Sequence, residues 1–174
     1  MTVTLRAFIA EGLEAAWKDL RTVTQDLTQE QLLWHAAPEA NSIGYLLWHV
    51  GRVEDNFIQR FLLRGDEVWT GRGWQERFGY QTRGIGTGFT PGETEQVPIP
   101  SLELVWGYLD DVREHTLRYL SALDWSTLPE KPRAERFPQW SIQTILRQLS
   151  AHANQHLGEI NYLRGLMGLP GALG

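Results

Sequence analysis

Apolar side chains recur three or four positions apart in four long segments of the chain. That spacing places them on one face of an α-helix. The predicted helices cover residues 4–24, 43–64, 101–123 and 141–165. Ser42 is placed to cap the start of the second helix and Gly65 to end it. Since no segment between them has a convincing strand pattern, the sequence predicts an all-α four-helix bundle, formed as a single domain over residues 1–174.

The connector between the second and third predicted helices, residues 66–100, breaks the helical pattern and is rich in glycine and aromatic residues. A connection this long is usually functional or disordered, and its aromatic residues favour a loop packed over one end of the bundle. Its Gly84–Gly88 run is not a phosphate-binding loop, because it neither follows a strand nor opens a helix. Four aromatic residues are candidates for pocket walls, with burial in the core as the alternative: Trp48, Trp69, Trp74 and Phe78.

Composition narrows the classes of function. The 16 basic and 21 acidic residues give a net charge of -5, and no basic run stands out, so we expect no nucleic-acid partner. The chain has no cysteine, so any metal site must use histidine and carboxylate ligands. The N-terminus does not have the pattern of a signal peptide, and no apolar run approaches bilayer-spanning length. We therefore expect a soluble, cytoplasmic protein that does not enter membranes.

Two histidines interrupt the apolar face of the last predicted helix. His152 and His156 lie four residues apart, so both side chains project from the same face. The apolar residues that share this face are Ile142, Ile145, Leu149, Ile160 and Leu163. Burying imidazoles without partners is unfavourable, and a metal ion can be bound by histidines with this spacing. The alternative is a pair of core or edge histidines hydrogen-bonded to carbonyls or water.

A third inward histidine, His49, lies beside Leu46 and Val53 on the second predicted helix. Together with His152 and His156 it supplies three neutral nitrogen donors. Three protein ligands with the remaining positions open are typical of catalytic zinc sites. Zinc, nickel, iron and manganese all accept imidazole, and ligand type alone does not choose among them.

Other polar residues near these histidines are weaker candidates. The second residue of an HExxH motif is Ala153 here, which disfavours a zinc protease. Glu159 lies close to the histidine face and is a candidate to orient an imidazole or act as a base, with a solvated carboxylate as the alternative. Asn56 lies along the helix from His49 and is a similar candidate, whereas Glu54 is expected to project toward the surface. His35 is expected to lie in a connector, and His115 is expected to lie at the surface.

Two segments resemble the motif helices of the DinB/YfiT-like superfamily of metal-binding four-helix bundles: IGYLLWHVGRVEDNFIQRFLL (43–63) and QLSAHANQHLGEINYLRGL (148–166). VWTGRGWQERFG and GTGFTP resemble the connector in one of its branches. The resemblance implies an up-down-down-up bundle, a metal site at His49, His152 and His156, and a homodimer. Related branches include isomerases and transferases that use mycothiol or bacillithiol, and many members have no assigned reaction.

These observations lead to one leading hypothesis and two rivals. The leading one is a metal-dependent enzyme acting on a small molecule, of thiol transferase or hydrolase type, with zinc or nickel favoured. A low-molecular-weight thiol such as bacillithiol or mycothiol is a candidate cofactor. The first rival is a non-catalytic metal- or ligand-binding stress-response protein. The second is an interaction module whose core histidines are satisfied without metal and whose apolar face forms a dimer.

Overall fold

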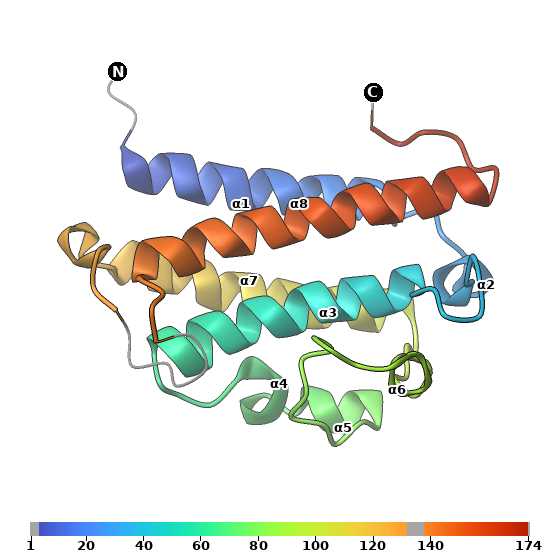
Figure 1. Cartoon of the computed structure of the whole chain (residues 1–174), viewed down its shortest axis with the longest axis horizontal. Helices are drawn as coiled ribbons and strands as arrows, with labels where there is room; N and C mark the ends of the chain where they lie inside the picture. The colour runs from blue at the N-terminus through green and yellow to red at the C-terminus, as the bar shows by residue number, and fades with distance from the viewer. Residues whose placement is uncertain (1–3, 132–137, 174) are drawn as a thin grey trace.

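The computed structural model describes residues 4–131 and 138–173, which are helical with no strand in either range. Four long helices lie side by side (Figure 1). They are α1 (Leu5–Thr22), α3 (Ile43–Asp55), α7 (Leu102–Ala122) and α8 (Ile142–Leu166). Two short elements, α2 (Gln29–Leu33) and the 3₁₀ turn η2 (Trp125–Thr127), lie in the connectors. No helix in the described ranges is both long enough and apolar enough to cross a bilayer.

The helices pack as antiparallel and parallel neighbours. In Figure 1, α1 and α8 run in one direction, whereas α3 and α7 run in the other. α1 packs mainly against α8, and α3 packs against both α7 and α8. α3 and α8, which carry the three inward histidines, are therefore in direct contact.

Each long helix begins at a hydroxyl side chain that accepts a hydrogen bond from the backbone N–H three residues later. These caps are Thr4, Ser42, Ser101 and Ser141. Each cap satisfies one backbone N–H that would otherwise lack a partner, and is worth about 1 kcal/mol. The predicted role of Ser42 is confirmed.

The second predicted helix is two elements. α3 ends at Asp55 and continues without a break into η1, a π-helix over Asn56–Leu62. Arg64 follows with a positive φ of 57°, and the predicted end at Gly65 is marked by its N–H, which donates to the carbonyl of Gln59 at 2.9 Å. The prediction missed the π-helix because spacing of apolar residues does not distinguish the hydrogen-bond pattern of an α-helix from that of a short π-helix.

The long connector forms three short helices, α4 (Val68–Gly71), α5 (Trp74–Phe78) and α6 (Pro91–Glu95). It lies along the flank of α3 (Figure 1), so the predicted position over one end of the bundle is wrong. Trp48, Trp69, Trp74 and Phe78 are each no more than 6% exposed and belong to one core cluster. Their burial holds the connector against the bundle. These residues therefore follow the alternative prediction, burial in the core, and not the prediction of pocket walls.

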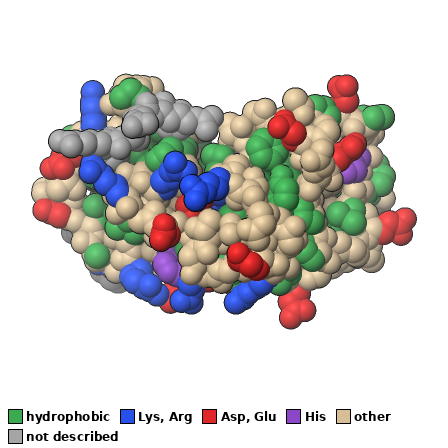
Figure 2. All heavy atoms as spheres, turned by 90° about the horizontal axis from the view of Figure 1, so that it is seen from below, with side chains coloured by type: hydrophobic (Ala, Val, Ile, Leu, Met, Phe, Trp, Pro, Cys, Tyr) green, Lys and Arg blue, Asp and Glu red, His purple; other side chains and the backbone are tan. Residues whose placement is uncertain are grey.

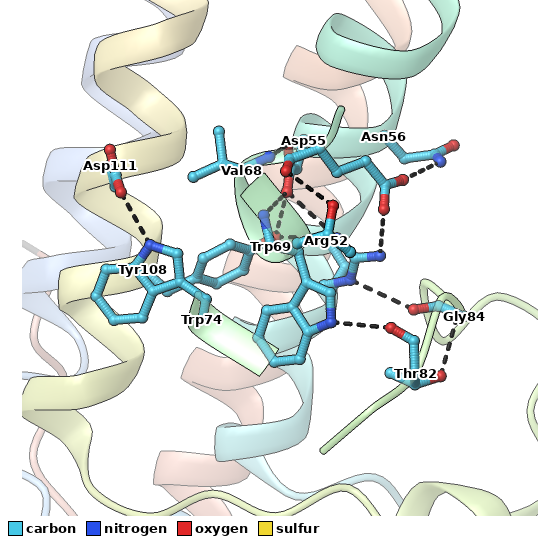
Figure 3. Close-up of polar contacts among 12 residues, drawn as sticks. Arg52, Asp55, Asn56, Val68, Trp69, Trp74, Thr82, Gly84, Tyr108 and Asp111 are labelled. Carbon is cyan, nitrogen blue, oxygen red and sulfur yellow. Dashed lines mark hydrogen bonds and ion pairs between the residues drawn. The ribbon is translucent and has the colours of Figure 1, made fainter. Parts of the chain in front are cut away.

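A buried network of charges joins α3 to the connector (Figure 3). The side chains of Arg52 and Asp55 are fully buried, with 3.2 Å between Nη1 and Oδ2. Arg52 Nη2 also donates to Glu67 Oε2 at 2.9 Å. The carboxylate of Asp55 accepts the backbone N–H groups of Val68 and Trp69, each at 2.8 Å. Asp55 therefore caps the start of α4 and holds it against α3.

Glu54 lies in the interior, so its predicted position at the surface is wrong. It is 3% exposed, and its Oε2 accepts hydrogen bonds from Trp17 Nε1 at 3.1 Å and Arg113 Nη2 at 2.9 Å. The physical reason is that α3 is enclosed by α7, α8 and the connector, and every one of its residues is buried. A helix without an exposed face must give each polar side chain a partner within the protein.

Removing the carboxylate of Asp55 tests how far the connector depends on this network. We expect Asp55→Ala to lower the free energy of unfolding by about 3–5 kcal/mol, because it leaves Arg52 buried with less compensation. The matched control is Asp110→Ala at an exposed ion pair with Arg21, where side chains are 45% and 59% exposed. That change is expected to cost less than about 1 kcal/mol. Urea unfolding followed by tryptophan fluorescence compares the two, and equal losses would contradict the role given to Asp55.

Candidate metal centre

The three inward histidines meet at the interface of α3 and α8. The Nε2 atom of His152 lies 3.1 Å from Nε2 of His49 and 3.1 Å from Nε2 of His156. One ligand atom from each histidine lies within 4.8 Å of the other two. The structure thus brings together the three residues that the sequence singled out, with the same ring nitrogen of each facing the others.

Hydrogen bonds on the outer side of two rings determine which nitrogen carries the proton. His49 Nδ1 lies against the backbone carbonyl of Ile85, and His156 Nδ1 lies 2.7 Å from Glu159 Oε2. A carbonyl and an ionised carboxylate can only accept, so both Nδ1 atoms carry a proton. In the neutral rings, Nε2 of His49 and Nε2 of His156 then present lone pairs toward His152.

These lone pairs fit a bound cation. A neutral His152 has at most one proton on Nε2, which can satisfy only one of its two neighbours. The other neighbour would then hold its lone pair 3.1 Å from Nε2 of His152 with no proton between the two nitrogens. A divalent cation accepts all three lone pairs together, and hydrogen-bonded outer nitrogens are the usual arrangement of metal-bound histidines.

Burial keeps two of the rings in the form that binds metal. It lowers the pKa of His49 to about 4 and is the main cause of the lowered pKa of His152, which is about 3. The neighbouring histidines lower the pKa of His152 further. Both side chains are therefore neutral near pH 7, and neither has to lose a proton before it binds a metal.

The connector holds His49 through consecutive backbone carbonyls. Arg52 Nε donates to the carbonyl of Gly84 at 3.3 Å, and His49 donates to the next carbonyl, that of Ile85. Both donors project from the same side of α3, and Arg52 also belongs to the buried charge network. The connector and the orientation of His49 are therefore linked through one segment.

Gly86 completes this contact and has no room for a larger residue. Its carbonyl accepts from the Tyr45 hydroxyl at 2.9 Å, and its φ is 89°. A Cβ atom added there would lie 2.7 Å from His49 Nδ1 and 2.8 Å from the Tyr45 hydroxyl oxygen. The glycine run that does not fit a phosphate loop therefore lets the backbone lie closely against α3.

The remaining candidates lie in different places. Glu159 does contact a histidine of the cluster, as the first of its two predicted roles requires. Asn56 donates to Glu67 and so supports the connector network. His35 bonds the backbone of its own loop through Ala40 O at 2.6 Å. The contact of the Ile85 carbonyl with His49 was not predicted, because every residue has a backbone carbonyl and the residue type does not show which one is used. The glycines near Ile85 were the only indication in the sequence.

Comparisons with known proteins agree with this arrangement. The family model of the DinB superfamily matches residues 12–160. The chain belongs to the DinB superfamily. The matched range includes all three histidines, and membership together with their convergence fits a metal-binding site.

A solved structure supports the fold of this DinB superfamily chain. The crystal structure of the conserved protein of locus from Enterococcus faecalis has a TM-score of 0.84 and 23% sequence identity to it. The similarity covers 96% of this chain and 99% of that one. At this identity the likeness establishes the fold alone. None of the curated proteins compared matches the chain.

Two glycine substitutions separate backbone strain from contact with His49. Gly86 and Gly88 both have positive φ, but a Cβ at Gly88 meets no atom within 4 Å. We expect Gly88→Ala to cost about 1 kcal/mol of stability and to leave metal affinity unchanged. If His49 binds a metal, Gly86→Ala should also weaken that binding by about tenfold or more, because it displaces the hydrogen-bond partner of His49. Calorimetric titration with the metal measures the affinity of each variant. Equal metal affinities of Gly86→Ala and Gly88→Ala would contradict the role given to the contact between Gly86 and His49.

The lowered histidine pKa values predict how the metal-free protein responds to pH. Between the ordinary pKa of about 6.5 and the folded values, the unfolded chain binds more protons. The stability contributed by neutral His49 and His152 is thus present above about pH 6.5 and lost as the pH falls toward 4. Urea unfolding of metal-free protein at about pH 7 and pH 5 should show this loss.

The matched control for this pH dependence is the double variant His49→Gln, His152→Gln. Burial raises the pKa of Asp55 to about 6, which gives a dependence of the opposite sign. Asp55 is present in both proteins, so its contribution cancels when their slopes are compared. Stability of the original protein should fall more steeply toward low pH than that of the double variant. Equal slopes would show that the two histidines are not held neutral by folding.

Proposed function

We propose that His49, His152 and His156 bind a divalent metal ion, with zinc and nickel favoured, in a metal-dependent enzyme that acts on a small molecule. The observation that carries the proposal is the convergence of three Nε2 atoms, two of them held as acceptors by bonds at Nδ1. The absence of cysteine makes histidine the main nitrogen or sulfur donor available. The single domain over residues 1–174 and the up-down-down-up topology belong to the same proposal, and the helix directions in Figure 1 support them.

The donor set supports hydrolytic or thiol chemistry. A metal ion with three protein ligands and open positions lowers the pKa of a bound water or thiol. Around it, Ile85 and Glu159 hold the protons on the outer nitrogens of His49 and His156. The side chain of Glu159 is 44% exposed, so the histidine that it orients is connected to solvent. The proposed reaction is thiol transfer or hydrolysis, with a low-molecular-weight thiol such as bacillithiol or mycothiol as candidate cofactor.

The alternative is a non-catalytic metal- or ligand-binding protein of stress-response type. The burial of the site favours it, because His49 and His156 are each only 8% exposed. A ligand would approach from the side of His152, which is the more exposed of the three. Both proposals require the metal, but only the enzyme requires turnover.

The proposed setting is a cytoplasmic homodimer without a nucleic-acid partner. The exposed apolar side chains Leu5 and Phe8, at 53% and 68% exposure, support an association surface on α1. On the face seen in Figure 2, acidic side chains are interspersed among the basic ones, which gives no continuous basic surface for phosphates.

Elemental analysis of the purified protein tests the metal site. We expect about one divalent ion per chain, lost in His49→Ala and retained in His115→Ala, whose ring lies outside the cluster. Glu159→Gln should bind the ion about 10–100-fold more weakly, because it changes the acceptor for His156. Retention of the ion in His49→Ala, with affinity unchanged in Glu159→Gln, would overturn the site.

A screen for turnover then separates the enzyme from the binder. Metal-loaded protein is incubated with several low-molecular-weight thiols and electrophiles, and with ester and amide substrates. The enzyme proposal expects turnover that His152→Ala abolishes and His115→Ala does not. Metal retention without turnover of any substrate would favour the non-catalytic alternative.

A further inference from the structure

A groove between η1 and α7 has the features of a second ligand site. Its volume is about 410 Å³, within the range of small-molecule sites. It begins at Gln59, ten residues after His49 along the continuous α3–η1 helix, which corresponds to roughly 15 Å. It is therefore separate from the histidine cluster, and the inference does not rest on the proposed metal chemistry.

Gln59 is the observation that points to a ligand. Gln59 is 7% exposed and lines the groove. Within residues 4–131 and 138–173, its side-chain amide makes no hydrogen bond to the protein, and the amide is open to the groove. An amide that lines a groove and is not used by the protein can donate to and accept from a ligand that enters it. Gln59 also lies in a π-helix, a rare element that is frequent at functional sites.

The groove combines an apolar wall with hydrogen-bond donors. Leu63 and Leu123 contribute apolar surface, and Tyr119 and Arg118 add a phenol and a guanidinium. Burial raises the pKa of Tyr119 to about 12, so its hydroxyl stays a neutral donor. Arg118 is paired with Glu114, but the two side chains are 62% and 67% exposed, and such pairs are weak enough to be exchanged.

Two further groups at the groove limit the charge of the ligand. His115 donates from Nδ1 to the carbonyl of Asp111 at 2.8 Å, which leaves Nε2 as its free nitrogen. Asp124 also lines the groove, and its Oδ1 accepts from the N–H and hydroxyl of Ser126. One carboxylate at the rim opposes a highly charged anion but leaves Arg118 to attract a single negative charge. The basic side chains on the face in Figure 2 lie on the half of the molecule that holds η1.

We propose that this groove binds a small monocarboxylic acid with an apolar or aromatic body. The carboxylate accepts hydrogen bonds from the Gln59 amide, the Tyr119 hydroxyl and the Arg118 guanidinium. The body of the ligand lies against Leu63 and Leu123. A charge-assisted bond to Arg118 and desolvation of the apolar body both favour binding.

An NMR titration of the metal-loaded full chain with benzoate and hexanoate tests the proposal. We expect saturable shifts in the amide signals of residues 59–63 and 115–124. Benzamide, which has the same ring without the charge, should bind more weakly than benzoate. Shifts confined to residues 152–159 would place the carboxylate at the metal and overturn the proposal, as would the absence of saturable shifts with millimolar probe.

Variants distinguish a ligand contact from a structural role. Gln59→Leu should weaken benzoate binding by about tenfold or more while leaving the melting temperature nearly unchanged, since it removes no hydrogen bond within the described part of the protein. Arg118→Gln should weaken benzoate but not benzamide. The matched control Gln143→Leu, on the exposed side of α8, should change neither. If Gln59→Leu fails to fold, Arg118→Gln and Tyr119→Phe still decide: unchanged benzoate affinity in both would overturn the proposal.

Discussion

The burial of Arg52 is the constraint on which the arrangement of this protein depends. A guanidinium with no exposed surface is tolerated only when acceptors surround it. Here they are Asp55 on its own helix, the Tyr108 hydroxyl on α7, and Glu67 and Gly84 in the connector. Satisfying Arg52 therefore places a long and otherwise irregular segment against α3. Asp55 extends the same network by capping α4, so the connector begins in a defined position. The aromatic side chains then add apolar area to a segment whose path the charges have already restricted.

The position of the connector in turn orients His49 through a backbone carbonyl. The carbonyl after Gly84 belongs to Ile85, and it meets Nδ1 of His49. A carbonyl acceptor fixes the tautomer of His49 and turns the lone pair of Nε2 toward α8. His156 is oriented differently, by the partly exposed carboxylate of Glu159 on its own helix. The orientation of His49 thus depends on the tertiary position of the connector, whereas that of His156 depends only on helical spacing. Loosening the connector should disturb His49 before it disturbs His156.

The long helices and the three histidines could be predicted from the sequence because both depend on local spacing. Residues four apart share a helix face whatever the rest of the fold does, so His152 and His156 had to project together. The position of Glu54 could not be predicted, because it depends on how many neighbours enclose α3. The π-helix after Asp55 could not be predicted either, because only its backbone hydrogen bonds change while the apolar pattern continues. The acceptor at Ile85 could not be predicted because it is a main-chain atom.

The buried polar groups of this chain fall into two kinds, and access separates them. Glu54 Oε1 and Arg113 Nη1 lack partners but are fully enclosed, so no ligand of appreciable size can reach them. The Nε2 atoms of the histidine cluster and the amide of Gln59 differ from these, because His152 is partly exposed and Gln59 borders a groove. A polar group with unused hydrogen-bonding capacity that a solute can reach is a place where a ligand can bind. The same enclosed helix, with its π-helical continuation, carries one such place toward α8 and another toward α7.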